Sequence, residues 1–565
     1  MSRLKRRAPA MVALLMTTLA LGGIAIAEQE AMIQPALLSS SERVALEAMM
    51  AEHIELTLKG MAPDEGQLFP VKVIAKFDTN GMLQVELGRR FVVKPDGNLV
   101  SGVELQDQLE ALDGVMGSMV TEVKYEGIDY LFEGKNILYY FPELDPGKGV
   151  KAQPSALPFP PYLPPPVYGD PARAYIPSQP YPVATYNRPT VAINPGHGLY
   201  KLYDTGRFNP NYHWAKQREP SNGIVEDDVT PLYATELKRW FAERSREVDA
   251  TSTRSISTQA HAQSTEESGV TYLWTDMGAK YNVEQLYPGR PDLWDVTSDA
   301  DRERDRFKDI NSRALLANEL GAQAMISLHT NAARDAVSAL TARGTQVFYK
   351  AGRAEDRALA NSVACYMQEL ITAQIGYADW TMRQTMGSNS YAENNGSMPS
   401  ALVEIAFHTH VDDALALQDS RFRTASMKGV KKGYRMWREG KPCKPLSIAS
   451  VTDSSAPKGS KALSNIHFEG HPTFPVTLRL DILKCPTGWS CTSGDSKYAQ
   501  SQASPLSWTF GCNASTSGVT RVRSMLTDSD GVESNLMESN VTCTASSSAN
   551  IANETASAPM AGNAW

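Results

Sequence analysis

Three short motifs carry side chains that can bind a metal or move a proton. His197 follows one short apolar run of the sequence, His329 ends a second, and Glu404 lies inside a third. Each run reads as a buried strand, and in an open α/β sheet the side chains at the carboxyl ends of strands converge on one crevice. The sequence therefore predicts that these three residues meet at one edge of a sheet.

Two imidazoles and one carboxylate are the ligand set of a hydrolytic zinc site, which keeps one position open for water. A further carboxylate can supply the base. Glu226 precedes a predicted helix and could approach the same edge of the sheet. Each residue alone is weak evidence, because a single histidine is more often structural than a ligand. Glu404 is harder to explain as structural, since burying a carboxylate costs several kcal/mol unless it has a partner.

The elements that must position these residues alternate between strand and helix over residues 190–443. This alternation predicts an α/β fold, namely an open sheet with helices on both faces. A polar segment at 255–305 interrupts the order and reads as an insertion. We expect it to border the site as a lid or a binding loop.

Four further segments flank this catalytic domain. Residues 28–150 predict a small mixed α+β domain whose role is binding, positioning or export rather than chemistry. Residues 151–189 hold twelve of the 34 prolines and predict a semi-rigid extended linker. Apolar and polar residues alternate in several runs over 446–544, which predicts a disulfide-bearing, β-sandwich-like domain. The tail 545–565 is rich in Ser, Ala and Asn and is expected to be disordered.

Residues 1–27 read as a cleaved signal peptide. Basic residues precede an apolar run that ends in Ala25-Ile26-Ala27. The predicted location is therefore the periplasm, the cell envelope or the extracellular space, with no stable membrane insertion after cleavage. The net charge of −8 gives no reason to expect a nucleic-acid partner, which would need a basic face.

Six cysteines fit an exported protein. Four of them crowd into the C-terminal region and are expected to form two disulfides in an oxidising compartment. Cys485–Cys491 with Cys512–Cys543 is one of three pairings that the sequence allows. Cys365 and Cys443 lie upstream of this group.

Taken in order, the motifs resemble those of the zinc-dependent N-acetylmuramoyl-L-alanine amidases of the Amidase_3 type. The resemblance covers residues 190–440 and rests on Ile193–Gly198 (INPGHG), Glu226 before its helix, Thr253-Arg254, Asn311-Ser312-Arg313, Ile326–Asn331 (ISLHTN) and Leu402–Phe407 (LVEIAF). It implies one zinc ion per chain, held by His197, Glu226 and His329, with Glu404 catalytic. It also implies cleavage of the amide that joins N-acetylmuramic acid to L-Ala in peptidoglycan.

The sequence departs from the family pattern at two places near the predicted site. The stretch between His197 and Glu226 is longer than usual, which leaves Glu219 as an alternative ligand. His408-Thr409-His410 replaces a more typical Asn-containing turn and has the spacing of a metal motif, although a polar loop at the end of a strand explains it better.

Two other functions stay open from the sequence. The same ligands serve zinc peptidases that act on free peptides, and a vestigial amidase fold could serve as a non-catalytic cell-wall-binding scaffold. The retention of all four polar residues argues against the scaffold. The flanking domains are expected to bind wall polymer or a protein partner of the envelope, but they offer no motif that names it.

Overall fold

The computed structural model describes residues 34–64, 66–70, 72–119, 123–145, 189–203, 212–244, 248–296, 303–333, 342–514 and 516–545. The predicted signal peptide, the linker up to residue 188 and the tail from residue 546 lie outside the described residues. No helix within the described ranges combines the length and the apolar run that a membrane crossing needs.

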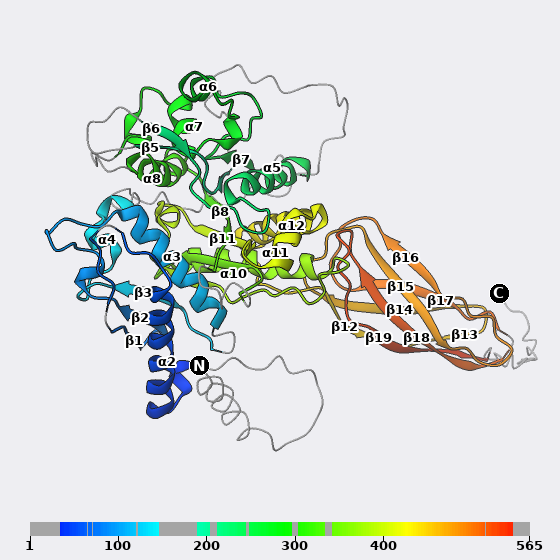
Figure 1. Cartoon of the computed structure of the whole chain (residues 1–565). Coiled ribbons are helices and arrows are strands. Elements are labelled where there is room, and N and C mark those ends of the chain that lie inside the picture. The colour runs from blue at the N-terminus through cyan, green and yellow to red at the C-terminus, as the bar shows by residue number, and fades with distance from the viewer. Residues whose placement is uncertain are drawn as a thin grey trace, which may run out of the picture.

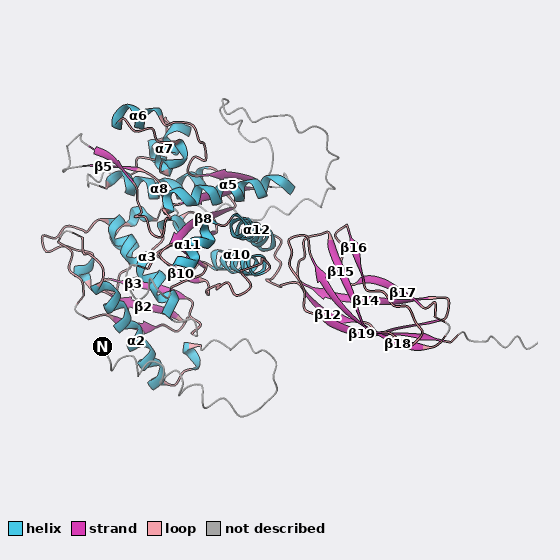
Figure 2. Ribbon diagram, turned by 45° about the vertical axis from the view of Figure 1, so that its right-hand side comes forward, coloured by secondary structure: helices cyan, strands magenta, loops and turns pink. Residues whose placement is uncertain are grey.

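A nine-stranded sheet forms the centre of the molecule, in the order β1-β2-β3-β10-β9-β11-β8-β4-β7. Figure 2 shows its strands β2, β3, β10 and β8 among the surrounding helices. Its six strands from the middle of the chain are β4 (Thr190–Pro195), β7 (Asp249–Ser252), β8 (Ala324–Asn331), β9 (Gln346–Lys350), β10 (Met386–Ser388) and β11 (Ser400–Phe407). Strands β7, β4, β8 and β11 run parallel, whereas β9 is antiparallel to β11. Every residue of β8 and β11 is buried, which explains their nearly continuous apolar sequence.

Helices cover both faces of this sheet, which confirms the predicted fold class. On β8, Ile326 packs into a core with Leu237 and Val363, whereas its neighbour Met325 packs on the opposite face with Ala317. Successive side chains of a strand point to opposite faces, so the helices that carry these partners lie on the two sides of the sheet. The helices of this region are α5 (Glu226–Arg244), α8 (Arg304–Glu319), α10 (Ala354–Thr372), α11 (Val411–Gln418) and α12 (Ser420–Arg438).

The N-terminal segment adds three strands to the same sheet. Its elements are α2 (Ser40–Lys59), β1 (Ile74–Phe77), β2 (Met82–Glu86), α3 (Gly102–Met119), β3 (Gly127–Leu131) and α4 (Ile137–Tyr140). Strand β3 pairs in parallel with β10, and Ile128 shares one hydrophobic core with Phe348 and Leu402. The boundary expected between 28–150 and 190–443 stays a prediction, but the sheet and its core are continuous across it.

Helix α3 is tied to this sheet by a buried carboxylate. Asp113 is fully buried and accepts hydrogen bonds from the hydroxyls of Tyr130 (3.0 Å) and Ser388 (2.6 Å). Burial raises the pKa of Asp113 to about 7, although both hydrogen bonds favour its charged form. Asp113 therefore links α3 to strands β3 and β10 and holds a proton more tightly in the folded chain than in the unfolded one.

This raised pKa predicts how the Asp113→Asn variant changes the pH dependence of stability. Between about pH 4 and about pH 7 the unfolded chain loses the Asp113 proton before the folded chain does, so the free energy of unfolding contributed by Asp113 falls as pH rises. Asparagine does not titrate, and the variant should lack this fall. Urea unfolding at about pH 4.5 and about pH 7.5 checks it. If the free energy of unfolding of the variant differed from that of wild type by the same amount at both pH values, the prediction would be contradicted.

The segment predicted as an insertion contains short helices rather than an irregular loop. These are α6 (Ala262–Ser268) and α7 (Ala279–Leu286), which pack near the hairpin of β5 (Tyr200–Tyr203) and β6 (Tyr212–Ala215). The backbone N–H of Leu199 donates to the carbonyl of Asp276, so the segment contacts the chain just after His197.

The C-terminal region forms two packed sheets, which extend from one side of the molecule (Figure 1). Their strands pair antiparallel except β13, which pairs in parallel with β19. One sheet has the order β12-β14-β17 and the other β13-β19-β18-β15-β16. The strands are β12 (Ser447–Val451), β13 (Ser454–Pro457), β14 (Lys461–Glu469), β15 (Val476–Lys484), β16 (Gly494–Tyr498), β17 (Leu506–Gly511), β18 (Gly518–Thr527) and β19 (Met537–Thr544). The predicted sandwich is therefore confirmed.

Three disulfides are present. The two disulfides expected among the four C-terminal cysteines are Cys485–Cys491 and Cys512–Cys543, one of the three pairings that the sequence allowed. A third bridge, Cys365–Cys443, joins α10 to the segment that leads into the sandwich. Below about 100 residues a domain has a modest core, so the two bridges within the sandwich supply stability that its core cannot.

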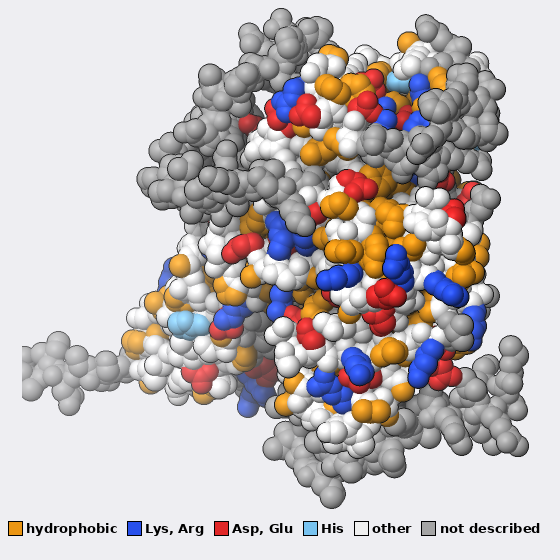
Figure 3. Space-filling view, turned by 90° about the vertical axis from the view of Figure 1, so that its left-hand side faces the viewer, with side chains coloured by type: hydrophobic (Ala, Val, Ile, Leu, Met, Phe, Trp, Pro, Cys, Tyr) orange, Lys and Arg blue, Asp and Glu red, His pale blue; other side chains and the backbone are white. Residues whose placement is uncertain are grey.

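One face of the molecule mixes charges of both signs. Figure 3 shows Lys and Arg side chains interspersed with Asp, Glu and apolar side chains over one face of the molecule. A nucleic-acid-binding protein instead gathers its basic side chains on one face. The face in Figure 3 has the character of an ordinary solvated surface.

Candidate metal centre

The register of the sheet brings the predicted residues to one edge. Glu404 on β11 lies opposite His329 on β8, and β8 pairs in parallel with β4, which ends just before His197. Gly196 permits the close approach, because a Cβ at this position would overlap the imidazole ring of His329. Gly196, the first glycine of the INPGHG motif, is therefore required for His197 and His329 to lie side by side.

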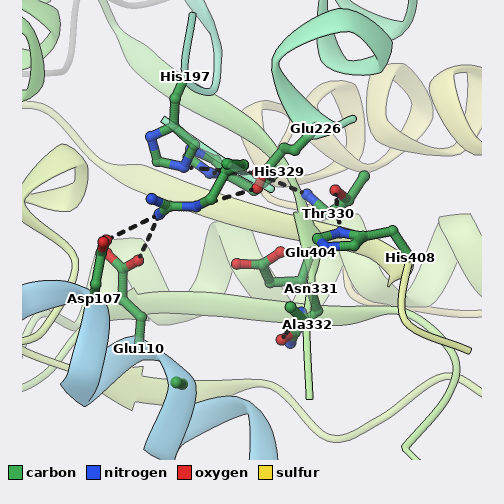
Figure 4. Close-up of a pocket in the computed structure, with 12 residues that line it drawn as sticks. Asp107, Glu110, His197, Glu226, His329, Thr330, Asn331, Ala332, Glu404 and His408 are labelled. Carbon is green, nitrogen blue, oxygen red and sulfur yellow. Dashed lines mark hydrogen bonds and ion pairs between the residues drawn. The ribbon is translucent and has the colours of Figure 1, made fainter. Parts of the chain in front are cut away.

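Three side chains place ligand atoms where one metal ion could contact all of them. Oε1 of Glu226, the first residue of α5, lies 3.1 Å from Nδ1 of His329 and 3.7 Å from Nε2 of His197. Tetrahedral zinc, with bonds of about 2.0–2.2 Å, needs ligand atoms roughly 3.3–3.6 Å apart. The two measured separations bracket this range. Figure 4 shows the three side chains converging from different elements, with Glu404 close beneath them.

Buried polar atoms of the site have no partner within the protein. In the described part of the chain, neither ring nitrogen of His197 nor Oε2 of Glu404 has a hydrogen-bond partner. Leaving a buried polar atom unpaired costs about 1–3 kcal/mol. Such atoms need an explanation, and a cation with its water is one that suits two imidazoles and two carboxylates. The residues therefore fit a metal ion.

The pKa values of the two carboxyl groups, Glu404 and Glu226, are shifted in opposite directions. Burial raises the pKa of Glu404 well above its ordinary value, and the charge of Glu226 adds to the rise. Burial also works to raise the pKa of Glu226, but His329 and Arg218 outweigh it and lower that pKa. Neighbouring carboxyl groups with opposite pKa shifts are the arrangement that acid–base catalysis uses.

His197 is suited to bind a metal. Burial, reinforced by the positive charge of Arg218, lowers the pKa of His197 well below its ordinary value. A neutral imidazole offers a lone pair, and metal binding requires that unprotonated form.

Buried charged side chains hold the His197 loop through its backbone. Asp227 accepts a hydrogen bond from the His197 N–H (3.3 Å). Arg313 donates to the carbonyl of His197 (2.6 Å), and Arg254 donates to the carbonyl of Gly196 (2.9 Å). Both guanidinium groups are fully buried, so they fix the loop rather than contact a substrate.

Thr330, next to His329, connects two further parts of the site. Its N–H donates to Oε1 of Glu226 (3.0 Å), and its hydroxyl lies 2.9 Å from Nδ1 of His408. His408 lines the pocket, whereas His410 lies 3.6 Å from Asp413 and outside it. His408 and His410 therefore do not face one point. This agrees with the interpretation of His408-Thr409-His410 as a polar loop rather than a metal motif.

Helix α3 closes the side of the pocket opposite the strands. Asp107 and Glu110 on α3 line the pocket together with the predicted residues (Figure 4). Arg218 bridges the two groups: its guanidinium lies 3.1 Å from Asp107, 3.5 Å from Glu110 and 3.5 Å from Glu226. With α3 in this place, Glu404 is only 6% exposed.

All four residues predicted for the site line this one pocket, namely His197, Glu226, His329 and Glu404. Glu219, the alternative ligand, is exposed and does not line it. The structure thus places Glu226 beside the histidines and Glu219 away from them.

The sequence did not reveal Arg218, Asp107 or Glu110 as pocket residues. The unusual length of the segment before Glu226 was the only signal for Arg218. Nothing pointed to Asp107 and Glu110, because they belong to a helix about 90 residues before His197 whose contacts are long-range.

Comparison with known proteins finds a family match in the middle of the chain. Residues 295–435 match the family model described as N-acetylmuramoyl-L-alanine amidase, a span that includes His329 and Glu404. Comparison with curated proteins gives no match.

Several solved structures are similar to part of the chain. An N-acetylmuramoyl-L-alanine amidase from Clostridium difficile 630 is 18% identical, with 46% of this chain and all of that chain covered and a TM-score of 0.29. The catalytic domain of the amidase CwlV from Bacillus (Paenibacillus) polymyxa var. colistinus is 16% identical, with 45% and 99% covered and a TM-score of 0.27. An amidase from Mycobacterium smegmatis is 12% identical, with 45% and 98% covered and a TM-score of 0.29.

Proposed function

We propose, from the match of residues 295–435 to the N-acetylmuramoyl-L-alanine amidase family model, that the chain is an exported zinc hydrolase that cleaves the amide between N-acetylmuramic acid and L-Ala in peptidoglycan. One observation carries the proposal. The family-matched strands β8 and β11 bring His329 and Glu404 to the same pocket as His197 and Glu226. Two imidazoles and two carboxyl groups in one pocket support the proposal, because they are the residue types that metal-assisted amide hydrolysis uses as ligands and base.

His197, Glu226 and His329 would hold the zinc ion. When bound, zinc lowers the pKa of its water towards 7 and polarises the amide carbonyl. Glu404 accepts the proton of the attacking water at its free Oε2 and then delivers it to the departing amine of L-Ala. Its raised pKa suits both steps, because a carboxylate with high proton affinity is a stronger base and its acid form is stable enough to wait for the leaving group.

Export to the cell envelope supports access to this substrate. The signal-like sequence at residues 1–27 and the three disulfides are both typical of proteins that reach an oxidising compartment. Peptidoglycan is the partner that follows from the proposed reaction.

Mass spectrometry of digested peptidoglycan tests the bond that is cut. Purified protein loaded with zinc is incubated with sacculi, and the released fragments are analysed. Free stem peptides that begin at L-Ala, together with glycan chains that keep an intact lactyl group, are the expected products. Cleavage within the stem peptides would indicate a zinc peptidase instead. Binding to sacculi without release of fragments would indicate a wall-binding scaffold.

A further inference from the structure

A second buried carboxylate lies near Nε2 of His329, the ring nitrogen that does not face Glu226. Glu393 belongs to the short 3₁₀ helix Ala392–Asn395 that precedes β11, and its side chain is fully buried. Its Oε1 lies 3.9 Å from Nε2 of His329. Within the described ranges, neither of these two atoms has a hydrogen-bond partner.

The two nitrogens of His329 face different carboxylates. Nδ1 lies 3.1 Å from Glu226 and so faces the ligand cluster, whereas Nε2 faces Glu393. A neutral imidazole carries one N–H, and a proton on Nε2 leaves the lone pair of Nδ1 free for a metal. Metal-binding histidines almost always donate their other N–H to a carboxylate, a carbonyl or water, which fixes the tautomer and the orientation of the ring.

We propose that Glu393 is a positioning residue for the metal centre: it accepts a hydrogen bond from Nε2–H of His329 and thereby presents Nδ1 to the ion. A small rotation of either side chain brings the two atoms from 3.9 Å to hydrogen-bonding distance, about 2.7–3.2 Å. The proposal rests on the zinc site of the proposed function and extends it to a residue outside the ligand set.

Helix α3 holds Glu393 in place. Nε2 of Gln106 donates to the other carboxylate oxygen of Glu393 (3.3 Å). Gln106 thus lies behind Glu393 in the same way that Glu393 lies behind His329. The same helix carries Asp107 and Glu110, which pair with Arg218 beside Glu226. The N-terminal segment therefore supports two of the three ligands, each through one intermediate side chain.

Zinc affinity of the purified full-length chain tests the proposal, with zinc ions as the probe in competition with a chromogenic chelator. Loss of a hydrogen-bond partner behind a metal ligand costs about 10–100-fold in metal affinity, and Glu393→Ala should weaken zinc binding by that factor. Glu393→Gln keeps an acceptor oxygen, so its loss should be smaller. Some loss is still expected, because Gln106 can turn its unpartnered Oε1 towards the new amide only by giving up the 2.7 Å hydrogen bond from its Nε2 to Glu110.

The matched control is Asp356→Asn, which changes another fully buried carboxylate that bonds to Ser400 and lies outside the pocket. Its zinc affinity should equal that of wild type. NMR spectra of histidine-labelled protein should show the Nε2–H tautomer of His329 in wild type and a mixture of tautomers in Glu393→Ala. Both readouts report on the metal site without any turnover.

The outcomes separate the inference from the proposed function. Wild-type zinc affinity in Glu393→Ala, with unchanged His329 tautomer, would overturn the positioning role and leave the zinc site intact. Complete loss of zinc in both Glu393 variants would also overturn it, because Glu393 would then be a ligand. If wild type itself binds no zinc, the proposed function fails together with the inference.

Discussion

Glu404→Gln should bind zinc as wild type does, yet release stem peptides from sacculi about 10²–10⁴-fold more slowly, the usual cost of removing a general base. Glutamine keeps the size of the side chain but cannot accept the proton of the attacking water. The three proposed ligands do not include Glu404, and they stay in place just after β4, on β8 and at the start of α5. Zinc content by atomic emission and peptide release by mass spectrometry are measured on the same preparation.

Glu219→Gln is the matched control, because Glu219 is an exposed glutamate in the segment between His197 and Glu226. It should retain both zinc and full activity. A zinc-free Glu404→Gln protein would show instead that Glu404 is a ligand. Loss of zinc in Glu219→Gln would restore Glu219 as the alternative to Glu226.

His329→Ala should lose both zinc and activity. Removal of one of three protein ligands leaves the ion with two and opens it to exchange with solvent. Activity should therefore fall below that of Glu404→Gln, which retains the ion. The expected pair of results is little or no zinc after gel filtration and no stem-peptide release above background.

An exposed histidine provides the control for this variant. His213→Ala removes an imidazole from the β5–β6 hairpin, outside the pocket, and should keep one zinc per chain. Activity in His329→Ala at the level of wild type would refute the assignment of His329 as a ligand. Thermal melting of each variant separates loss of the ion from loss of the fold.

Several of the candidate site residues were predictable because they depend on local patterns and on one rule of sheet geometry. His197 and Glu404 lie within or just after short apolar runs, and parallel strands bring such ends together. The close packing of the two histidines also has a sequence signal, since Gly196 directly precedes His197 and leaves the space that the ring of His329 occupies.

The rest of the site depends on contacts that leave no local signal. Asp107 and Glu110 look like ordinary charged positions of an amphipathic helix, and only the folded chain shows that they face Arg218. The pairing of β3 with β10 was equally hidden, because β10 has only three residues and includes Gly387. So short a strand gives no periodic pattern.

The shared core between the N-terminal strands and the central sheet has a consequence for folding cooperativity. If β3 left β10, buried side chains such as Phe348 and Met386 would lose part of their packing and the sheet would expose a new edge. The N-terminal segment should therefore melt together with the sheet that carries the pocket, while the disulfide-bonded sandwich, which has a core of its own, melts as a separate unit. The three regions that the sequence predicts at 28–150, 190–443 and 446–544 would then unfold as two cooperative units. A chain shortened to begin at residue 190 would lose the N-terminal side chains that complete the core of its central sheet.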